Sequence, residues 1–453
     1  MISKVLIANR GEIAVRVIRA CREMGIETVA VYSTADADAL HTQLADEAVC
    51  IGPPVLADSY LNPYNILSAA SITGADAIHP GYGFLSENSK FVRMCNASNV
   101  AFIGPDAEAM EKMGDKLMAR SIMRTAGVPV IPGSDGALES AEDARQCADS
   151  IGYPVMIKAA HGGGGRGIRR VERAEDVETA FDAASKEAVA SFGDGTLYME
   201  KCIEDARHIE VQILCDLYGN AIHLFERECS LQRRSQKVME EAPSAALSDK
   251  KRNEIGKAAV KAAKASGYKN AGTIEFLLSD DGNFYFMELN ARVQVEHPVT
   301  EMVTGIDIVR QQIMIANGAK LFDQSEVKLN GHSIECRINA EDYTNNFMPS
   351  TGKITVLHFP GGPGVRFDTA MYAGYVIPPY YDSMIGKLIV HAQSRDMAMA
   401  KMRAALTELV VDGVDTNTDF QLGLLGDPDV IEGRLDTGLV GRIMERWEEN
   451  GEI

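Results

Sequence analysis

The chain has 453 residues, of which 46% are hydrophobic and 24% charged, which is typical of water-soluble globular protein with room for about three domains. Its 64 acidic residues outnumber the 45 basic ones, and the net charge of −19 argues against a nucleic-acid partner, because phosphate backbones bind to basic surfaces. The eight cysteines form no C-x-x-C pair, which argues against zinc, and no apolar run suits a signal peptide or a membrane span, so we expect a cytoplasmic protein with no membrane partner.

The first hundred residues alternate short apolar strands with a helix. Residues 4–8 and 28–32 read as strands, and residues 12–24 have the apolar spacing of a helix. A further strand at 76–78 precedes the glycine-rich segment HPGYGFLSEN at 79–88. We therefore expect a parallel α/β unit in which this segment is either a ligand-facing loop at the carboxyl end of a strand or a structural turn.

A glycine-rich run follows the next predicted strand. A helix is expected from Gly114 to about Ala126, and Lys116 near its start is either a solvated lysine or a phosphate ligand. The strand 154–159 contains Lys158 and precedes GGGGRG at 162–167. A dinucleotide-binding loop should open a helix, yet a second strand follows this run. We interpret it as a flap whose N–H groups can lie against phosphates, with a disordered linker as the alternative.

Extended segments dominate the middle of the chain. Residues 198–203 read as a strand that joins the flap to the core, and the alternating run 208–216 returns as a strand at 221–225. The segment ECSLQRRSQKVMEEAP at 228–243 then gathers basic residues, including Lys237, in an acidic protein. It is either an anion site or a solvated basic turn. Helices are expected at 174–190, 253–265 and 307–317.

The run from Met287 to Glu296 has the most regular pattern in the chain. Apolar and polar residues alternate strictly, which indicates an extended strand with its polar side chains on one face. Asp281-Gly282 separates this run from the apolar segment 274–278, and such a dipeptide is a strong hairpin signal. A turn centred there places Glu275 directly opposite Glu288.

Two carboxylates that face each other across a ladder repel. If the pair were only structural, this repulsion would stay uncompensated, whereas a divalent cation would remove it. Mg²⁺ binds carboxylate and amide oxygens together with substrate phosphates, and Asn290 supplies an amide on the same face. We therefore expect Glu275, Glu288 and Asn290 to hold a metal ion, with a solvated sheet face as the alternative.

The last third of the chain is rich in glycine and proline. The alternating run ECRINAED at 335–342 holds Arg337, which on pattern alone would pair with Glu335 or Glu341. Beyond Pro349 the composition predicts a compact β-rich domain with a closing helix at 396–409.

The run ELNARVQVEHPVTE at 288–301, with TIEFL at 273–277 before it, resembles the metal and bicarbonate site of the biotin carboxylases, which belong to the ATP-grasp group. The resemblance extends over nearly the whole chain, with departures at His161 and Ser235. It implies an α/β protein with an N-terminal parallel α/β (pre-ATP-grasp) domain at 1–113. An ATP-grasp domain at 114–330 with a mobile glycine-rich lid at about 131–203, and a β-rich C-terminal domain at 331–453, complete the implied fold.

The resemblance also implies a role for each matching residue. The implied ATP-binding residues are Lys116, Lys158, Gly164, Gly165, Glu200, Lys201, Cys202, Ile203, His208, Gln232, Glu275, Leu277 and Glu288. Bicarbonate would be bound by Lys237, Arg292, Gln294 and Val295, and Mg²⁺ or Mn²⁺ by Glu275, Glu288 and Asn290. The implied catalytic residues are Arg292, Glu296, Arg337 and Lys237, with Glu296 as the base and Arg337 facing biotin.

The activity implied is ATP-dependent carboxylation of biotin by bicarbonate through carboxyphosphate, as in acetyl-CoA carboxylase, or else in a propionyl-CoA or pyruvate carboxylase. The implied partners are a biotin carboxyl carrier protein, carboxyltransferase subunits and a second copy of the chain, with dimer contacts at Arg19, Glu23 and Arg366. Met399-Ala400-Lys401-Met402 is similar to a biotin attachment motif but lies in a helical pattern, so we expect the chain to carry no biotin itself. Two other classes stay open: another ATP-grasp ligase that forms an acyl phosphate, and a non-catalytic nucleotide-binding subunit.

Overall fold

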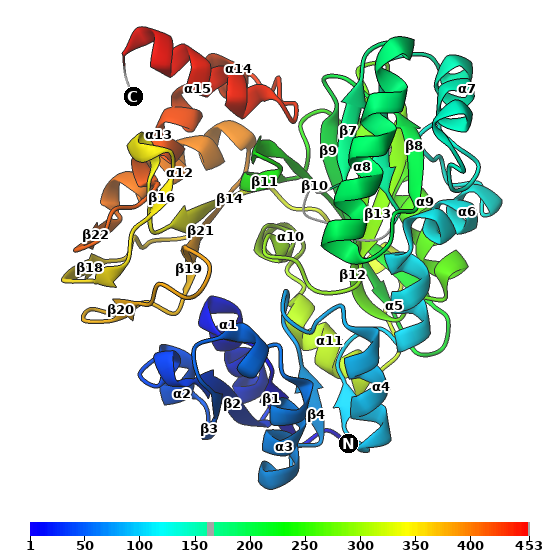
Figure 1. The fold of residues 1–453 in the computed structure, drawn as a ribbon. Coiled ribbons are helices and arrows are strands. Elements are labelled where there is room, and N and C mark those ends of the chain that lie inside the picture. The colour runs from blue at the N-terminus through cyan, green and yellow to red at the C-terminus, as the bar shows by residue number, and fades with distance from the viewer. Residues whose placement is uncertain (161–166, 452–453) are drawn as a thin grey trace.

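The computed structural model describes residues 1–160 and 167–451, which form an N-terminal unit, a central unit and a C-terminal unit (Figure 1). The central unit, in cyan to yellow-green, carries most of the long strands, and helix α10 (His297–Thr304) lies where the three units meet. His161, Gly164 and Gly165 fall outside the described residues. Within the described part of the chain, no helix is long and apolar enough to cross a membrane.

The N-terminal unit is a five-stranded parallel sheet in the order β3-β2-β1-β4-β5. Val5, Leu6 and Ile7 are fully buried because helices cover both faces of a parallel sheet, as their continuous apolar run predicts. The parallel α/β prediction is confirmed. The strands are β1 (Lys4–Ile7), β2 (Glu27–Ser33), β3 (Glu47–Gly52), β4 (Ala77–His79) and β5 (Ala101–Phe102). The helices are α1 (Gly11–Glu23), α2 (Leu40–Leu44), α3 (Pro63–Thr73), α4 (Ser89–Ala97) and α5 (Ala107–Gly114), with short 3-10 turns at Thr34–Asp36 and Leu56–Asp58.

A separate three-stranded antiparallel sheet holds the residues on either side of the glycine-rich run. Its order is β7-β6-β8, with β6 at Val155–Ala159, β7 at Ile168–Val171 and β8 at Leu197–Lys201. Two helices, α7 (Ala141–Ile151) and α8 (Val177–Phe192), pack on it, with a 3-10 turn at Ala174–Asp176, and α6 (Lys116–Thr125) precedes it. The two strands predicted on either side of the glycine run are confirmed by β6 and β7, whereas residues 161–166 of the run lie outside the described residues.

One eight-stranded antiparallel sheet, in the order β13-β12-β9-β10-β11-β14-β21-β19, runs through the central and C-terminal units. The strands are β9 (Arg207–Cys215), β10 (Ala221–Arg233), β11 (Gln236–Ala242), β12 (Asn270–Leu278), β13 (Phe284–Asn290), β14 (His332–Asn339), β19 (Val365–Thr369) and β21 (Met384–Ala392). The sheet therefore continues across residue 330 through the pairing of β11 with β14. Helices α9 (Asp249–Ser266), α10 and α11 (Ile308–Ala316) accompany the central strands, with a 3-10 turn at Gln324–Glu326.

The C-terminal unit contains more helix than expected. The predicted closing helix is α12 (Arg395–Glu408), and α13 (Thr418–Gly426), α14 (Pro428–Ile431) and α15 (Leu439–Asn450) follow it. Three two-stranded ribbons pair β15 (Glu341–Asp342) with β16 (Met348–Pro349), β17 (Gly352–Lys353) with β20 (Val376–Ile377), and β18 (Val356–His358) with β22 (Val410–Asp412), and a 3-10 turn lies at Tyr343–Asn345. The segment 399–402, which is similar to a biotin attachment motif, lies within α12, where the Lys401 amine donates to the carbonyl oxygens of Pro363 and His391.

Two strand predictions need correction. The strand expected to reach Glu296 ends at Asn290, because the next N–H, that of Ala291, donates to the Glu87 carboxylate and not to a neighbouring strand. Helix α10 then begins at His297, with Pro298 in its first turn, where proline is favourable. The strand expected at 221–225 extends to Arg233, so the basic segment is divided between β10 and β11, and only Arg234 and Ser235 form the turn, both with positive φ.

Candidate active site

A cavity of about 820 Å³ opens between the small sheet, the large sheet and the C-terminal unit. Every residue with a predicted catalytic, ATP-binding, bicarbonate-binding, biotin-binding or metal-binding role lines it, except Gly164 and Gly165, which fall outside the described residues. The lining includes Lys116, Lys158, Glu200, Lys201, Cys202, Ile203, His208, Gln232, Lys237, Glu275, Leu277, Glu288, Asn290, Arg292, Gln294, Val295, Glu296 and Arg337. The structure thus gathers residues separated by more than 200 positions around one space.

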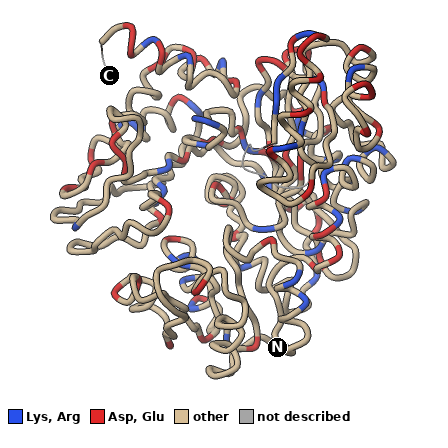
Figure 2. The backbone as a smooth tube through the Cα atoms, viewed as in Figure 1, with Lys and Arg blue, Asp and Glu red and all other residues tan. Residues whose placement is uncertain are grey.

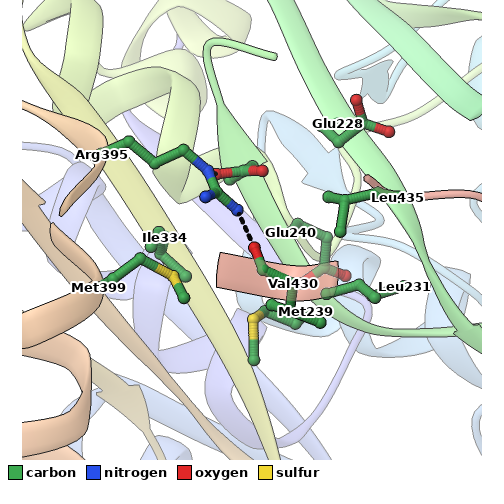
Figure 3. Close-up of a pocket in the computed structure, with 10 residues that line it drawn as sticks. Glu228, Leu231, Met239, Glu240, Ile334, Arg395, Met399, Val430 and Leu435 are labelled. Atoms are coloured by element: carbon green, nitrogen blue, oxygen red, sulfur yellow. Dashed lines mark hydrogen bonds and ion pairs between the residues drawn. The ribbon is translucent and has the colours of Figure 1, made fainter. Parts of the chain in front are cut away.

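A second cavity lies between β11, β14 and α12 (Figure 3). It is only about 10 Å³, which is room for about one water molecule, and it is lined largely by apolar side chains such as Leu231, Met239 and Met399. Arg395 spans it and donates to the Val430 carbonyl oxygen at 2.8 Å. This cavity is too small for a nucleotide, so the large cavity is the candidate site.

Lys116 and Lys158 lie at one end of the large cavity. The Lys158 amine donates to Glu200 at 2.6 Å, and the same carboxylate pairs with the buried Arg120. Lys116 begins α6, and burial lowers the pKa of its amine. A polyanion such as a triphosphate would stabilise the charged form of Lys116, so this end has the chemistry of a phosphate site. The Lys201 amine instead donates to the carbonyl oxygens of Gly152 and Tyr153, which leaves mainly its backbone to face the cavity.

The predicted register of the hairpin is confirmed, because Glu275 stands directly opposite Glu288. The argument that the pair would stay uncompensated without a metal ion was wrong for Glu275. Its carboxylate accepts from Lys237 at 3.0 Å and lies 3.3 Å from the His208 ring. Burial opposes the shift, but these two cations hold the pKa of Glu275 well below its usual range. Burial and the charge of Glu275 raise the pKa of Glu288.

The carboxylate pair is well suited to bind a divalent cation, whereas the Asn290 amide oxygen already has a hydrogen-bond partner. Glu288 is exposed to the cavity, and its raised pKa marks an anion that an added cation would stabilise. Asn290 donates its amide N–H to Glu275 at 2.8 Å, and its amide oxygen accepts from Arg292 at 3.0 Å. Glu275 and Glu288 could therefore hold Mg²⁺ directly, whereas Asn290 would have to give up its contact with Arg292.

Lys237 is the centre of a buried acidic cluster. Its amine donates to Glu210 and Glu296 at 2.6 Å each and to Glu275 at 3.0 Å. Burial alone would lower the pKa of Lys237, but the three carboxylates raise it well above its usual value. Burial alone would also lower the pKa of His208, but the charge of Glu275 together with hydrogen bonds to Glu210 and Glu275 raises that pKa to about 9. Both groups are therefore cations at neutral pH.

Glu296 joins this cluster to Arg337. Its second carboxylate oxygen accepts from Arg337 at 3.0 Å, and Arg337 also donates to the buried Glu240 at 2.7 Å. The partners expected on pattern alone, Glu335 and Glu341, are therefore not those found. Despite burial and the charge of Glu210, Lys237 and Arg337 lower the pKa of Glu296, so this carboxylate is ionised at neutral pH. Burial raises the pKa of Glu240 to about 7.

Side chains from distant segments fix the segment 291–296, which follows β13. Arg292 donates to Glu87 at 3.0 Å, and Glu87 lies in the glycine-rich segment 79–88. Gln294 donates to Glu275 at 2.8 Å and accepts from Arg227 at 2.8 Å. Arg227 is fully buried and also binds Glu210. Sequence reasoning missed Glu87, Glu210 and Arg227. The alternation around 208–216 could have placed Glu210 on one face with His208, but no pattern identified Arg227.

Lysine and arginine positions are interspersed with aspartate and glutamate positions along the described chain (Figure 2). The cationic side chains of the cavity are therefore local features of an acidic protein. They lie beside carboxylates that could hold a metal, and beside Arg292, which is mostly buried. Groups that can bind phosphate, a carboxylate and a metal ion in one cavity are the combination that phosphoryl transfer to an oxyanion needs.

Comparisons with known proteins agree with this chemistry. Family models match at residues 1–110 (Biotin carboxylase, N-terminal domain), 115–324 (Carbamoyl-phosphate synthase L chain, ATP binding domain) and 335–442 (Biotin carboxylase C-terminal domain). The chain is 56% identical to Biotin carboxylase 1 of Bacillus subtilis over 439 residues, which are 96% of this chain and 98% of that protein.

Solved structures give the same result. A complex of Campylobacter jejuni biotin carboxylase with β,γ-ATP superposes with a TM-score of 0.95 at 54% identity, covering 98% of this chain and 99% of that one. The biotin carboxylase domain dimer of Hydrogenobacter thermophilus 2-oxoglutarate carboxylase, with MgADP, ADP and bicarbonate, gives a TM-score of 0.93 at 50% identity and covers 98% of both chains. The chain therefore belongs to the biotin carboxylase family of ATP-grasp enzymes.

Proposed function

We propose that this chain carboxylates biotin on a biotin carboxyl carrier protein, using ATP and bicarbonate, as the first half-reaction of an acetyl-CoA carboxylase. The observation that carries the proposal is the direct contact of Glu296 with both Lys237 and Arg337. One carboxylate thereby joins the acidic cluster around Lys237 to an arginine suited to a second substrate. The proposed division is an N-terminal domain at 1–113, an ATP-grasp domain at 114–330 with a lid at about 131–203, and a C-terminal domain at 331–453.

In the proposed first step, bicarbonate lies between Arg292, Gln294 and the Val295 N–H. Arg292 can bind a carboxylate-like anion with two parallel hydrogen bonds. Glu296 takes the bicarbonate proton, and its lowered pKa suits this role because a base must be ionised before it accepts a proton. The bicarbonate oxygen then attacks the γ-phosphorus and ADP leaves, which gives carboxyphosphate. Lys237 lies beside the transferred group.

The second step uses the arginine side of the cavity. Carboxyphosphate separates into CO₂ and phosphate, and phosphate takes the ureido proton of biotin. Arg337 stabilises the negative charge that this leaves on the biotin oxygen, and the biotin nitrogen adds to CO₂. A closed lid would protect carboxyphosphate from water.

The remaining ligands are proposed from their match to the family, and those that the structure describes line the cavity. We propose that Mg²⁺, or Mn²⁺ in its place, is held by Glu275 and Glu288 with help from Asn290, where it would neutralise phosphate charge. For ATP we propose Lys116, Lys158, His208, Gln232 and Leu277, together with Glu200, the backbone of 201–203, and Gly164 and Gly165.

The proposed partners are the carrier protein, carboxyltransferase subunits and a second copy of the chain. Arg19 and Glu23 are exposed one turn apart on α1, and Arg366 lies on β19, where it pairs with Glu301 and Asp368. Light scattering after size exclusion would test the dimer. A cytoplasmic location stays a prediction.

The deciding experiment measures ADP release and ¹⁴C-bicarbonate incorporation on the same samples, with and without biotin. Dependence of both on bicarbonate, and of incorporation on biotin, supports the proposal. Release of ADP with amino acids in place of bicarbonate would favour another ligase, and the absence of turnover would favour a non-catalytic subunit. Reconstitution with carrier and carboxyltransferase subunits, using acetyl-CoA, propionyl-CoA or pyruvate, would identify the final acceptor.

A further inference from the structure

Lys387 is a fully buried lysine outside the set of residues described above as lining the cavity. It lies on β21, directly opposite Arg337 on β14 and Asp368 on β19. Directly opposed residues of an antiparallel pair project from the same face, so Lys387 and Arg337 share one face of the sheet. A buried lysine is uncommon unless its charge is compensated and its N–H groups are bound.

The Lys387 amine has two partners, and they belong to two other parts of the chain. It donates to the Val295 carbonyl oxygen at 2.8 Å, and it lies 3.1 Å from the Glu12 carboxylate on α1. Tyr82, from the glycine-rich segment 79–88, donates to the same Glu12 oxygen. Lys387 therefore connects the C-terminal unit, the N-terminal unit and the segment 291–296.

The contact with Val295 has a geometric consequence. A peptide group is planar, so fixing a carbonyl also fixes the N–H and the Cα atom that follow it. The Val295 carbonyl belongs to the peptide that leads into Glu296, the proposed base. The preceding carbonyl, that of Gln294, lies 2.7 Å from Nδ1 of the buried His297. Two successive carbonyl groups are thus fixed by buried side chains. His297 contacts the Gln294 carbonyl, and Lys387 contacts the Val295 carbonyl, which determines the direction of Glu296.

We propose that Lys387 is a positioning residue for bicarbonate activation, which sets the direction of Glu296 through the Val295 carbonyl and ties it to the strand pair that carries Arg337. This inference rests on the proposed function. Neither Lys387 nor Glu12 touches the proposed substrates. The expected effect is therefore on the use of bicarbonate, whereas the residues at the phosphate end keep their contacts, so binding of ATP should not change.

The test compares Lys387→Met/Glu12→Gln with the wild-type chain. The single change Lys387→Met leaves Glu12 buried without its cation and risks misfolding for that separate reason, whereas the double change removes both charges together. Misplacement of a reacting group by about 1 Å can cost on the order of 10²-fold, so kcat/KM for bicarbonate should fall by about that factor. The KM for ATP, and ADP affinity by calorimetry, should stay within about twofold of wild type by the same reasoning.

Lys401→Met is the matched control, because Lys401 also donates to two main-chain carbonyl oxygens but lies on α12, outside the large cavity. It should leave both kinetic constants unchanged. Hydrogen exchange of a peptide spanning 291–297 supplies a readout that does not depend on turnover, and exchange there should rise in the double variant only.

The inference is overturned if the folded double variant keeps wild-type kcat/KM for bicarbonate, or if bicarbonate and ATP constants worsen in parallel. An unfolded double variant would likewise count against it, because it would show that the pair acts in the stability of the fold. Failure of the proposed function would look different, since the wild-type chain would then show no bicarbonate-dependent release of ADP.

Discussion

Glu335 lies in β14 with its side chain fully buried. Neither of its carboxylate oxygens has a hydrogen-bond partner among the residues that the structure describes. Glu240 stands directly across the ladder, and the nearby amine of Lys387 is shared by Val295 and Glu12. Burial is the main cause of a pKa for Glu335 well above its usual value, with Lys387 opposing the shift and Glu240 adding to it. We therefore expect Glu335→Gln to change how stability depends on pH.

The sign follows from proton binding. Between the unfolded pKa of about 4.3 and the raised folded pKa, the folded chain binds more protons than the unfolded chain, so stability falls as pH rises through this window. The slope is about 1.4 kcal/mol per pH unit, and the glutamine variant lacks it. Relative to wild type, the variant should therefore gain up to about 2.7 kcal/mol between pH 5 and pH 7. Any cost of an unpaired amide, about 1 to 3 kcal/mol, is the same at both pH values.

The test is hydrogen exchange of peptides from β14 in the wild-type and variant chains at pH 5, 6 and 7, which gives the local opening free energy. Subtracting the wild-type value from the variant value at each pH cancels the intrinsic exchange rates. Glu445→Gln on the exposed face of α15 is the control and should give a constant difference. If the difference for Glu335→Gln is equally constant, the carboxyl group is ionised in the folded chain and the reasoning from its burial fails.

Three further predictions concern the candidate site. Glu288→Gln should abolish ATP cleavage and leave the thermal midpoint unchanged, because the metal ligand is lost and the carboxylate pair is relieved; normal turnover would exclude the metal role. Glu296→Ala should lower bicarbonate-dependent ADP release and carboxybiotin formation together by about 10²-fold or more. Arg337→Ala, combined with Glu240→Gln to avoid an unpaired carboxylate, should instead keep ADP release and lose most carboxylation. Equal loss of both activities in the arginine variant would assign it to the first step. Arg227→Met should lower the free energy of unfolding by about 3 to 5 kcal/mol, measured by denaturant titration, since one oxygen of the buried Glu210 carboxylate and the buried Gln294 amide oxygen lose their donor; a change below about 1 kcal/mol would contradict this.

The hairpin could be predicted because its signals are local. Asp281-Gly282 and the alternation on either side of it determine the turn and the register, and the structure places Glu275 opposite Glu288 as expected. The end of the second strand could not be predicted in the same way. The alternation continues to Glu296, but the Ala291 N–H donates to the carboxylate of Glu87, more than 200 residues earlier, and no local pattern predicts such a contact.

Charge compensation was the other limit. From sequence, Glu275 and Glu288 form a repelling pair, yet Lys237 and His208 reach Glu275 from strands that the sequence cannot align with β12. Arg227 was missed for the same reason, because a lone arginine in a strand gives no sign that it will be fully buried. The residue types of the site were therefore predictable from motifs, whereas the network that sets their protonation depends on the register of the whole sheet.

The eight-stranded sheet limits how this chain can be divided. A fragment ending at residue 330 would keep β11 but lose β14, which leaves unpaired N–H and C=O groups along residues 239–242. Exposed strand edges of this kind pair with other chains and promote aggregation. The nucleotide-binding part is therefore not an exchangeable module. In fusions or circular permutations, the chain should be opened at surface loops of the ribbons in the C-terminal unit, because the shared sheet then stays intact.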